Sequence, residues 1–195
     1  MQQEPHHTER ESLILYITSL DVSNGPMHGN LMIKHCLKKI YPDSEYSIAR
    51  MPSGKPYVLE DEELGISVSH SAGLYALLSS RSTSSIGVDI QKVDEKYSRD
   101  EIAKLSFCGK EIDYAENGIW EFFSIWASKE AYVKAKNLSL SAFKSFSIFD
   151  IPEGFSLFSV TDGNDEYALS IHPGRRKITL FMPSFLKIVP SDTLS

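Results

Sequence analysis

The order of hydrophobic patterns along the chain limits its possible folds most. An apolar, strand-like run at 12–20 is followed by a helical pattern at 31–40. Two further strand-like runs, at 65–71 and 74–80, flank Ala72-Gly73 and predict a hairpin. The first part of the chain is therefore expected to fold as strand, loop, helix and hairpin, which is an α+β pattern.

The second part of the chain follows a similar order. The run "IGVDI" predicts a strand, and three helical patterns and four strand-like runs come after it. The helices are expected at 98–107, 109–118 and 124–135, and the strands at 144–150, 155–161, 166–172 and 177–182. We therefore predict two similar α/β subdomains at 11–85 and 86–195, after a mobile tail at 1–10, although no residue-level repeat is visible.

Composition narrows the class of protein. With 42% hydrophobic and 24% charged residues among 195, the chain has the composition of a globular protein. A net charge of −6 argues against a protein that coats nucleic acid. Local basic pockets that hold an anionic small molecule are still compatible with this charge. No run approaches the roughly 20 apolar residues of a membrane span, and the first residues lack a secretory signal. We expect a soluble, cytoplasmic protein without a membrane or nucleic-acid partner.

Two carboxylates stand out as candidate metal ligands. The period of two along the strand at 86–91 puts Asp89 and Gln91 on the face opposite Val88 and Ile90. On the helix at 124–135, Glu130 and Lys134 share one stripe because they are four residues apart. Carboxylates from two elements can bind Mg²⁺ together with water and phosphate oxygens. The alternatives are that Asp89 pairs with a lysine or arginine, and that Glu130 and Lys134 form an ordinary surface ion pair.

The pattern "SVSHS" directs Ser67, Ser69 and Ser71 to one face of a strand and His70 to the other. Phosphate or nucleotide binding at this strand is possible, but a lone histidine in a core or turn is the more common finding. Lys55 lies in a turn rich in proline and glycine, where a lysine is more often solvated than bound to phosphate.

Five segments together resemble the 4′-phosphopantetheinyl transferases, in particular the larger Sfp type. They are "SGKPYV" (53–58), "ISVSHSAGLYAL" (66–77), "IGVDIQ" (86–91), "FCGKE" (107–111) and "WASKEAYVKAKNLSLS" (126–141). The resemblance implies two subdomains related by a pseudo-two-fold axis, with coenzyme A and Mg²⁺ in the cleft between them. It also implies transfer of phosphopantetheine to a serine of an apo acyl, polyketide or peptidyl carrier protein, with release of 3′,5′-ADP.

The resemblance further implies roles for individual residues. Asp89 and Glu130 match the metal-binding acids, and Glu130 also matches the general base. Lys129 and Lys134 match two lysines of the last motif, with Lys134 near the α-phosphate. The residues that match the site of the 3′-phosphoadenosine end are Lys55, Ser69 and His70.

Two features depart from the family pattern. Many members carry glutamate where this chain has Gln91, so a third metal ligand would be an amide oxygen or a water molecule. The basic segment that many relatives carry before the first helix is also missing, and only His28, Lys34 and Lys38-Lys39 are basic there.

Three functional hypotheses follow from these observations. The first is an active transferase, expected to be a monomer because both subdomains lie in one chain. The second is a non-catalytic relative that binds coenzyme A or a carrier protein, and it is motivated by Gln91 and by the short N-terminal part. The third, an unrelated Mg²⁺-dependent phosphodiesterase, is motivated by the acid pair alone.

Overall fold

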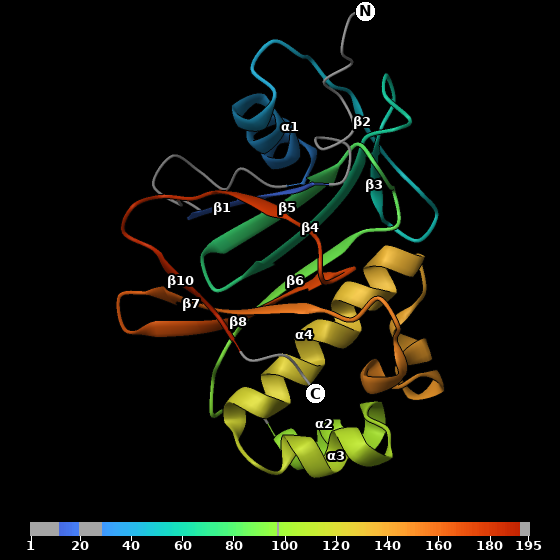
Figure 1. Ribbon diagram of the computed structural model, residues 1–195, viewed down its shortest axis with the longest axis vertical. Helices are drawn as coiled ribbons and strands as arrows, with labels where there is room; N and C mark the ends of the chain where they lie inside the picture. Colours follow the sequence, from blue (N-terminus) through green and yellow to red (C-terminus); the bar gives the residue numbers. More distant parts are fainter. Residues whose placement is uncertain (1–11, 20–28, 97, 192–195) are drawn as a thin grey trace, which may run out of the picture.

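The computed structural model describes residues 12–19, 29–96 and 98–191 and has a mixed α+β architecture with two four-stranded sheets (Figure 1). The predicted tail at 1–10, together with His28, lies outside the described residues. Within the described ranges, no helix is both long enough and apolar enough to cross a bilayer.

The first sheet has the strand order β4-β5-β1-β9. Its strands are β1 (Leu13–Ser19), β4 (Gly65–Ser71), β5 (Leu74–Ser80) and β9 (Ile178–Phe181). β1 pairs antiparallel with β5 and parallel with β9, so a segment from near the end of the chain completes a sheet formed mainly by its beginning. The predicted boundary between residues 85 and 86 stays a prediction.

The second sheet has the order β10-β7-β8-β6 and is antiparallel throughout. Its strands are β6 (Gly87–Lys92), β7 (Ser156–Asp162), β8 (Asp165–His172) and β10 (Lys187–Pro190). In both sheets a first strand pairs with the second strand of a later hairpin, β1 with β5 and β6 with β8. A pseudo-two-fold relation between the halves also stays a prediction.

The remaining elements cover the sheets or connect them. They are α1 (Asn30–Ile40), the small hairpin β2 (Ile48–Arg50) and β3 (Pro56–Val58), α2 (Arg99–Ser106), α3 (Gly109–Ala115), α4 (Ile119–Lys136), and the 3₁₀ helices η2 (Leu140–Ser145) and η3 (Ile148–Asp150). One apolar core lies between the two sheets, α1 packs on the first sheet, and α4 packs on β6 and β8 (Figure 1).

Most predicted elements are confirmed, but the strand predicted at 144–150 is wrong. This segment forms parts of η2 and η3 instead. The hydroxyl oxygens of Ser139 and Ser147 accept hydrogen bonds from the backbone N–H groups of Ser141 and Phe149, which favours tight helical turns over an extended chain. The short strands β2, β3 and β10 were not predicted either; β10 is a four-residue edge strand whose side chains are mostly exposed.

Serine side chains of β4 join the two sheets. The hydroxyl oxygens of Ser67 and Ser71 accept hydrogen bonds from the backbone N–H groups of Val88 and Lys92, at 3.1 and 3.0 Å. β6 is the edge strand of its sheet, so these bonds satisfy donors that have no strand partner. The predicted alternation along β4 is confirmed, since Ser67 and Ser69 are buried and His70 is exposed.

Helix α4 approaches β6 closely because residue 87 is glycine. A Cβ atom at Gly87 would lie 1.8 Å from the carbonyl oxygen of Ala131 and 2.9 Å from the nitrogen of Ala135. Both atoms belong to the helix backbone, which cannot move aside as a flexible side chain would. The distance between the strand that carries Asp89 and the helix that carries Glu130 therefore depends on this glycine.

Gly87→Ala is expected to lower the free energy of unfolding by at least about 1–3 kcal/mol, because the methyl group forces β6 and α4 apart. Urea denaturation followed by circular dichroism measures the change. Gly109→Ala is the matched control, because no atom lies within 4 Å of a Cβ built at Gly109 in helix α3. Equal stability of the two variants would contradict the close-approach argument.

Candidate active site

The centre of the site is a pair of carboxylates with a lysine between them. Asp89 comes from β6, and Glu130 and Lys134 come from one face of α4. The Nζ atom of Lys134 lies 2.6 Å from Oδ1 of Asp89 and 3.5 Å from Oε2 of Glu130. The structure thus brings together the three residues that the sequence singled out from two distant segments.

Both alternatives from the sequence hold in part. Asp89 does pair with a lysine, and Glu130 and Lys134 do form a pair four residues apart. The pair is not an ordinary surface pair, however, because the side chains of Glu130 and Lys134 are only 17% and 28% exposed and Asp89 is fully buried. Charges so poorly solvated interact more strongly than charges at the surface.

Two further side chains bind Asp89. The hydroxyl group of Ser69 donates a hydrogen bond of 2.6 Å to Oδ1, and the amide group of Gln91 donates one of 3.2 Å to Oδ2. Ser69 was expected near the nucleotide, but here it holds the carboxylate of Asp89. Together with Lys134, these contacts compensate the cost of burying an ionised acid.

Glu130 has the acid–base properties of a group that can exchange protons near neutral pH. Burial, and next the negative charge of Asp89, raise the pKa of Glu130 to about 7, although Lys134 opposes the shift. A carboxylate with a pKa near neutrality suits general-base catalysis.

The donor set fits a hard divalent cation. Asp89 and Glu130 supply carboxylate oxygens, and Gln91 could supply its amide oxygen, which are the oxygen ligands that Mg²⁺ binds. Among residues 12–19, 29–96 and 98–191, no three His, Cys, Asp or Glu side chains gather as a metal cluster. Water or substrate oxygens would therefore have to complete the coordination.

A cavity of about 260 Å³ adjoins the acid centre at Lys134. Its lining comes from the β2–β3 turn, from β4 and from the end of α4, and includes Arg50, Ser53, Gly54, Lys55, Ser67, Val133, Lys134, Asn137 and Leu138. Arg50, Lys55 and Lys134 are cationic, so an anionic ligand is favoured in an otherwise acidic protein.

The three residues that matched the 3′-phosphoadenosine site lie in different places in the structure. Lys55 lines the cavity, whereas Ser69 binds Asp89. His70 is exposed on the other face of β4, where its ring stacks on Tyr75 with 6.5 Å between the ring centroids. A nucleotide role for His70 stays a prediction.

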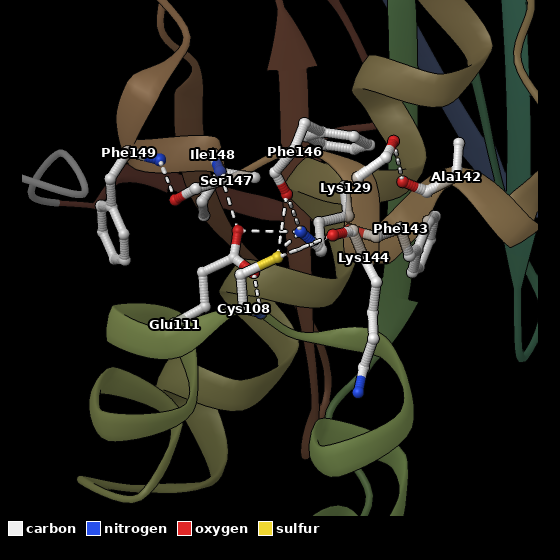
Figure 2. A network of polar contacts seen from close by, with 11 residues as sticks. Cys108, Glu111, Lys129, Ala142, Phe143, Lys144, Phe146, Ser147, Ile148 and Phe149 are labelled. Carbon is white, nitrogen blue, oxygen red and sulfur yellow. Dashed lines mark hydrogen bonds and ion pairs between the residues drawn. The ribbon is translucent and has the colours of Figure 1, made fainter.

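Lys129 lies in a separate, fully buried network (Figure 2). Its Nζ atom lies 2.8 Å from Oε2 of Glu111 and donates a hydrogen bond of 2.8 Å to the carbonyl oxygen of Phe146. Glu111 also accepts hydrogen bonds from the backbone N–H groups of Cys108 and Ile148. The network joins α3, α4 and the 3₁₀ segment, and the phosphate contact predicted for Lys129 has no support in this arrangement.

Sequence reasoning missed the roles of Arg50 and Glu111. Arg50 precedes the Pro/Gly turn, and its Nη1 atom donates a hydrogen bond of 2.8 Å to the carbonyl oxygen of Gly54 beside the cavity. Glu111 lies in the quoted segment "FCGKE", but no periodicity indicated a partner 18 residues away. Its position three residues after Cys108 fits a capping box, which is a usable local signal.

Glu130→Gln should alter how stability depends on pH. The pKa of Glu130 is raised from its ordinary value of 4.5 to about 7 in the folded protein, so the folded state binds the extra proton between these values. This group therefore makes the protein less stable as pH rises through that window. In urea denaturation with a chelator present, the stability of the glutamine variant relative to the wild type should increase from pH 5 to pH 8. A difference independent of pH would contradict the assignment.

Comparison with known proteins gives one family. Residues 85–180, just under half of the chain, match the family model described as the 4′-phosphopantetheinyl transferase superfamily. A search of curated proteins returned no match. The matched segment contains Asp89, Glu111, Lys129, Glu130 and Lys134, but not Lys55, Ser69 or His70. The part of the chain that carries Asp89, Glu130 and Lys134 is thus similar to a superfamily of transferases.

Proposed function

We propose that this protein transfers the 4′-phosphopantetheine group of coenzyme A to a serine hydroxyl of an apo carrier protein. The observation that carries the proposal is the placement of Asp89, Glu130 and Lys134 in one centre beside a cationic cavity, within the segment that matches the superfamily. All three residues come from one chain, so a monomer can provide them.

The cavity and the acid centre would bind different parts of coenzyme A. The nucleotide end would occupy the 260 Å³ cavity near Arg50, and Lys134 would contact the pyrophosphate. Asp89 and Glu130 would hold Mg²⁺, with Gln91 adding its amide oxygen directly or through water. When bound, the ion supplies charge stabilisation for the pyrophosphate oxygens.

Glu130 would accept the proton of the attacking serine. The serine oxygen forms a bond to the β-phosphorus, and the bond from this phosphorus to the oxygen that bridges it to the α-phosphate breaks. 3′,5′-ADP leaves with the bond electrons, and phosphopantetheine stays on the carrier protein. Lys134, close to both acids, would stabilise the negative charge that develops on the leaving group.

The direct test is incubation with coenzyme A, Mg²⁺ and a panel of apo carrier proteins, read by the intact mass of each carrier. Glu130→Gln should lower the transfer rate by ~10²–10⁴, the usual contribution of a general base. Glu101→Gln is the matched control, because Glu101 is an exposed glutamate on α2, outside the site. The proposal fails if no carrier gains mass, or if Glu130→Gln and Asp89→Asn transfer as fast as the wild type.

A non-catalytic relative is the second candidate, and Gln91 favours it. The amide of Gln91 faces Asp89 where many relatives carry a third carboxylate, so the site has one negative charge fewer for Mg²⁺. Binding of coenzyme A without transfer to any carrier would support this candidate.

Gln91→Glu should tighten Mg²⁺ binding, because a third carboxylate adds charge and a stronger oxygen ligand. Titration calorimetry with Mg²⁺ in the presence of 3′,5′-ADP measures the change, with an expected gain of roughly tenfold in affinity. Unchanged affinity would mean that residue 91 does not face the ion.

A further inference from the structure

The ammonium group of Lys55 contacts three backbone carbonyl groups in two segments of the chain. Its Nζ atom donates hydrogen bonds to the carbonyl oxygens of Ser84, Ile86 and Ala135, at 3.1, 3.3 and 3.5 Å. An ammonium group has three N–H donors, so three acceptors occupy all of them. Lys55 therefore has no donor left for a phosphate while these contacts persist.

The three acceptors belong to the segments that build the acid centre. Ile86 directly precedes β6, which carries Asp89, and Ala135 directly follows Lys134 in α4. Lys55 itself belongs to the turn between β2 and β3. One side chain thus connects the wall of the cavity to both elements that carry the candidate catalytic groups.

A second contact joins the same turn to the same helix. The hydroxyl group of Ser53 hydrogen-bonds to the side-chain oxygen of Asn137, the left-handed residue that ends α4. The turn is therefore attached to the end of α4 at two points, through Ser53 and through Lys55. Two attachments fix its orientation better than one.

Lys55 also lines two cavities. They are the 260 Å³ cavity beside Lys134 and a second cavity of about 540 Å³. Burial lowers the pKa of Lys55 to about 8. A lysine held in this way behaves as part of the cavity wall rather than as a mobile solvated cation.

We propose that Lys55 is a positioning residue that fastens the β2–β3 turn to β6 and α4, and that it does not bind the 3′-phosphate of the nucleotide. This inference rests on the proposed function, because it concerns the shape of the cavity that would hold coenzyme A. It assigns Lys55 a different task from the one that the family resemblance implies.

The two tasks predict different responses to removal of the 3′-phosphate. Calorimetry with coenzyme A and 3′-dephospho-coenzyme A would be carried out on the wild type and on Lys55→Met. If Lys55 is a positioning residue, Lys55→Met should weaken the binding of both ligands by a similar factor of about five or more, so that the ratio of the two dissociation constants stays within about twofold of the wild-type ratio. If Lys55 binds the 3′-phosphate, Lys55→Met should lower the affinity for coenzyme A alone, by roughly tenfold. That selective loss, or no loss for either ligand, would overturn the inference.

Lys136→Met is the matched control. Lys136 lies in the last turn of α4 and lines the 540 Å³ cavity, but it pairs with Glu153 and has no role in the acid centre. Its removal should leave both affinities unchanged. This result would show that Lys55→Met acts through the lost contacts of Lys55 and not through a general loss of positive charge. A loss equal to that of Lys55→Met would count against the inference.

The attachment of the β2–β3 turn by Lys55 can also be tested without a ligand. Hydrogen exchange of the backbone amides of Met51 and Gly54, which are bonded within the turn, should be about tenfold faster in Lys55→Met than in the wild type. Unchanged exchange would overturn the inference, whereas a wild type that binds neither ligand would overturn only the proposed function. If Lys55→Met does not fold, Lys55→Gln keeps an N–H donor at one bond less in length and allows the same comparison.

Discussion

The arrangement of the two sheets and of the acid centre depends on the contact between β4 and β6. β6 is an edge strand, and its unpaired N–H groups at Val88 and Lys92 need acceptors because they lie away from bulk water. Serine hydroxyl groups of β4 supply these acceptors, and Ser69, between them, binds Asp89. The same row of small polar side chains therefore closes a sheet edge, joins the two sheets and holds the central acid of the site.

Three lysines show how the surroundings decide what a cation does. Lys134 lies between two acids and lines a cavity, Lys129 is fully buried against Glu111, and Lys55 binds backbone carbonyl groups. Only Lys134 is both next to the acid centre and partly exposed, so it is the one best placed to meet a substrate. The other two stabilise the elements that surround the site.

The sequence predicted the individual elements well where their periodicity was strong. The hairpin β4–β5, the strand β6 and the helix α4 are confirmed, and the alternation on β6 correctly placed Asp89 and Gln91 on one face. The strand predicted at 144–150 is wrong because Phe146 and Ile148 alternate with serines as they would in a strand, although serine side chains bond to the nearby backbone. The parallel pairing of β9 with β1 joins residues more than 160 positions apart, and no local pattern encodes it.

The sequence alone determined the candidate acids and their spacing, because periods of two and 3.6 residues dictate which side chains share a face. Tertiary structure decided which of the basic residues meet these acids. Lys129 and Glu130 are adjacent in sequence, yet their side chains leave the helix about 100° apart and reach different partners. Such partners are set by packing between distant segments, as when Gly87 lets α4 come close enough to β6 for Lys134 to reach Asp89.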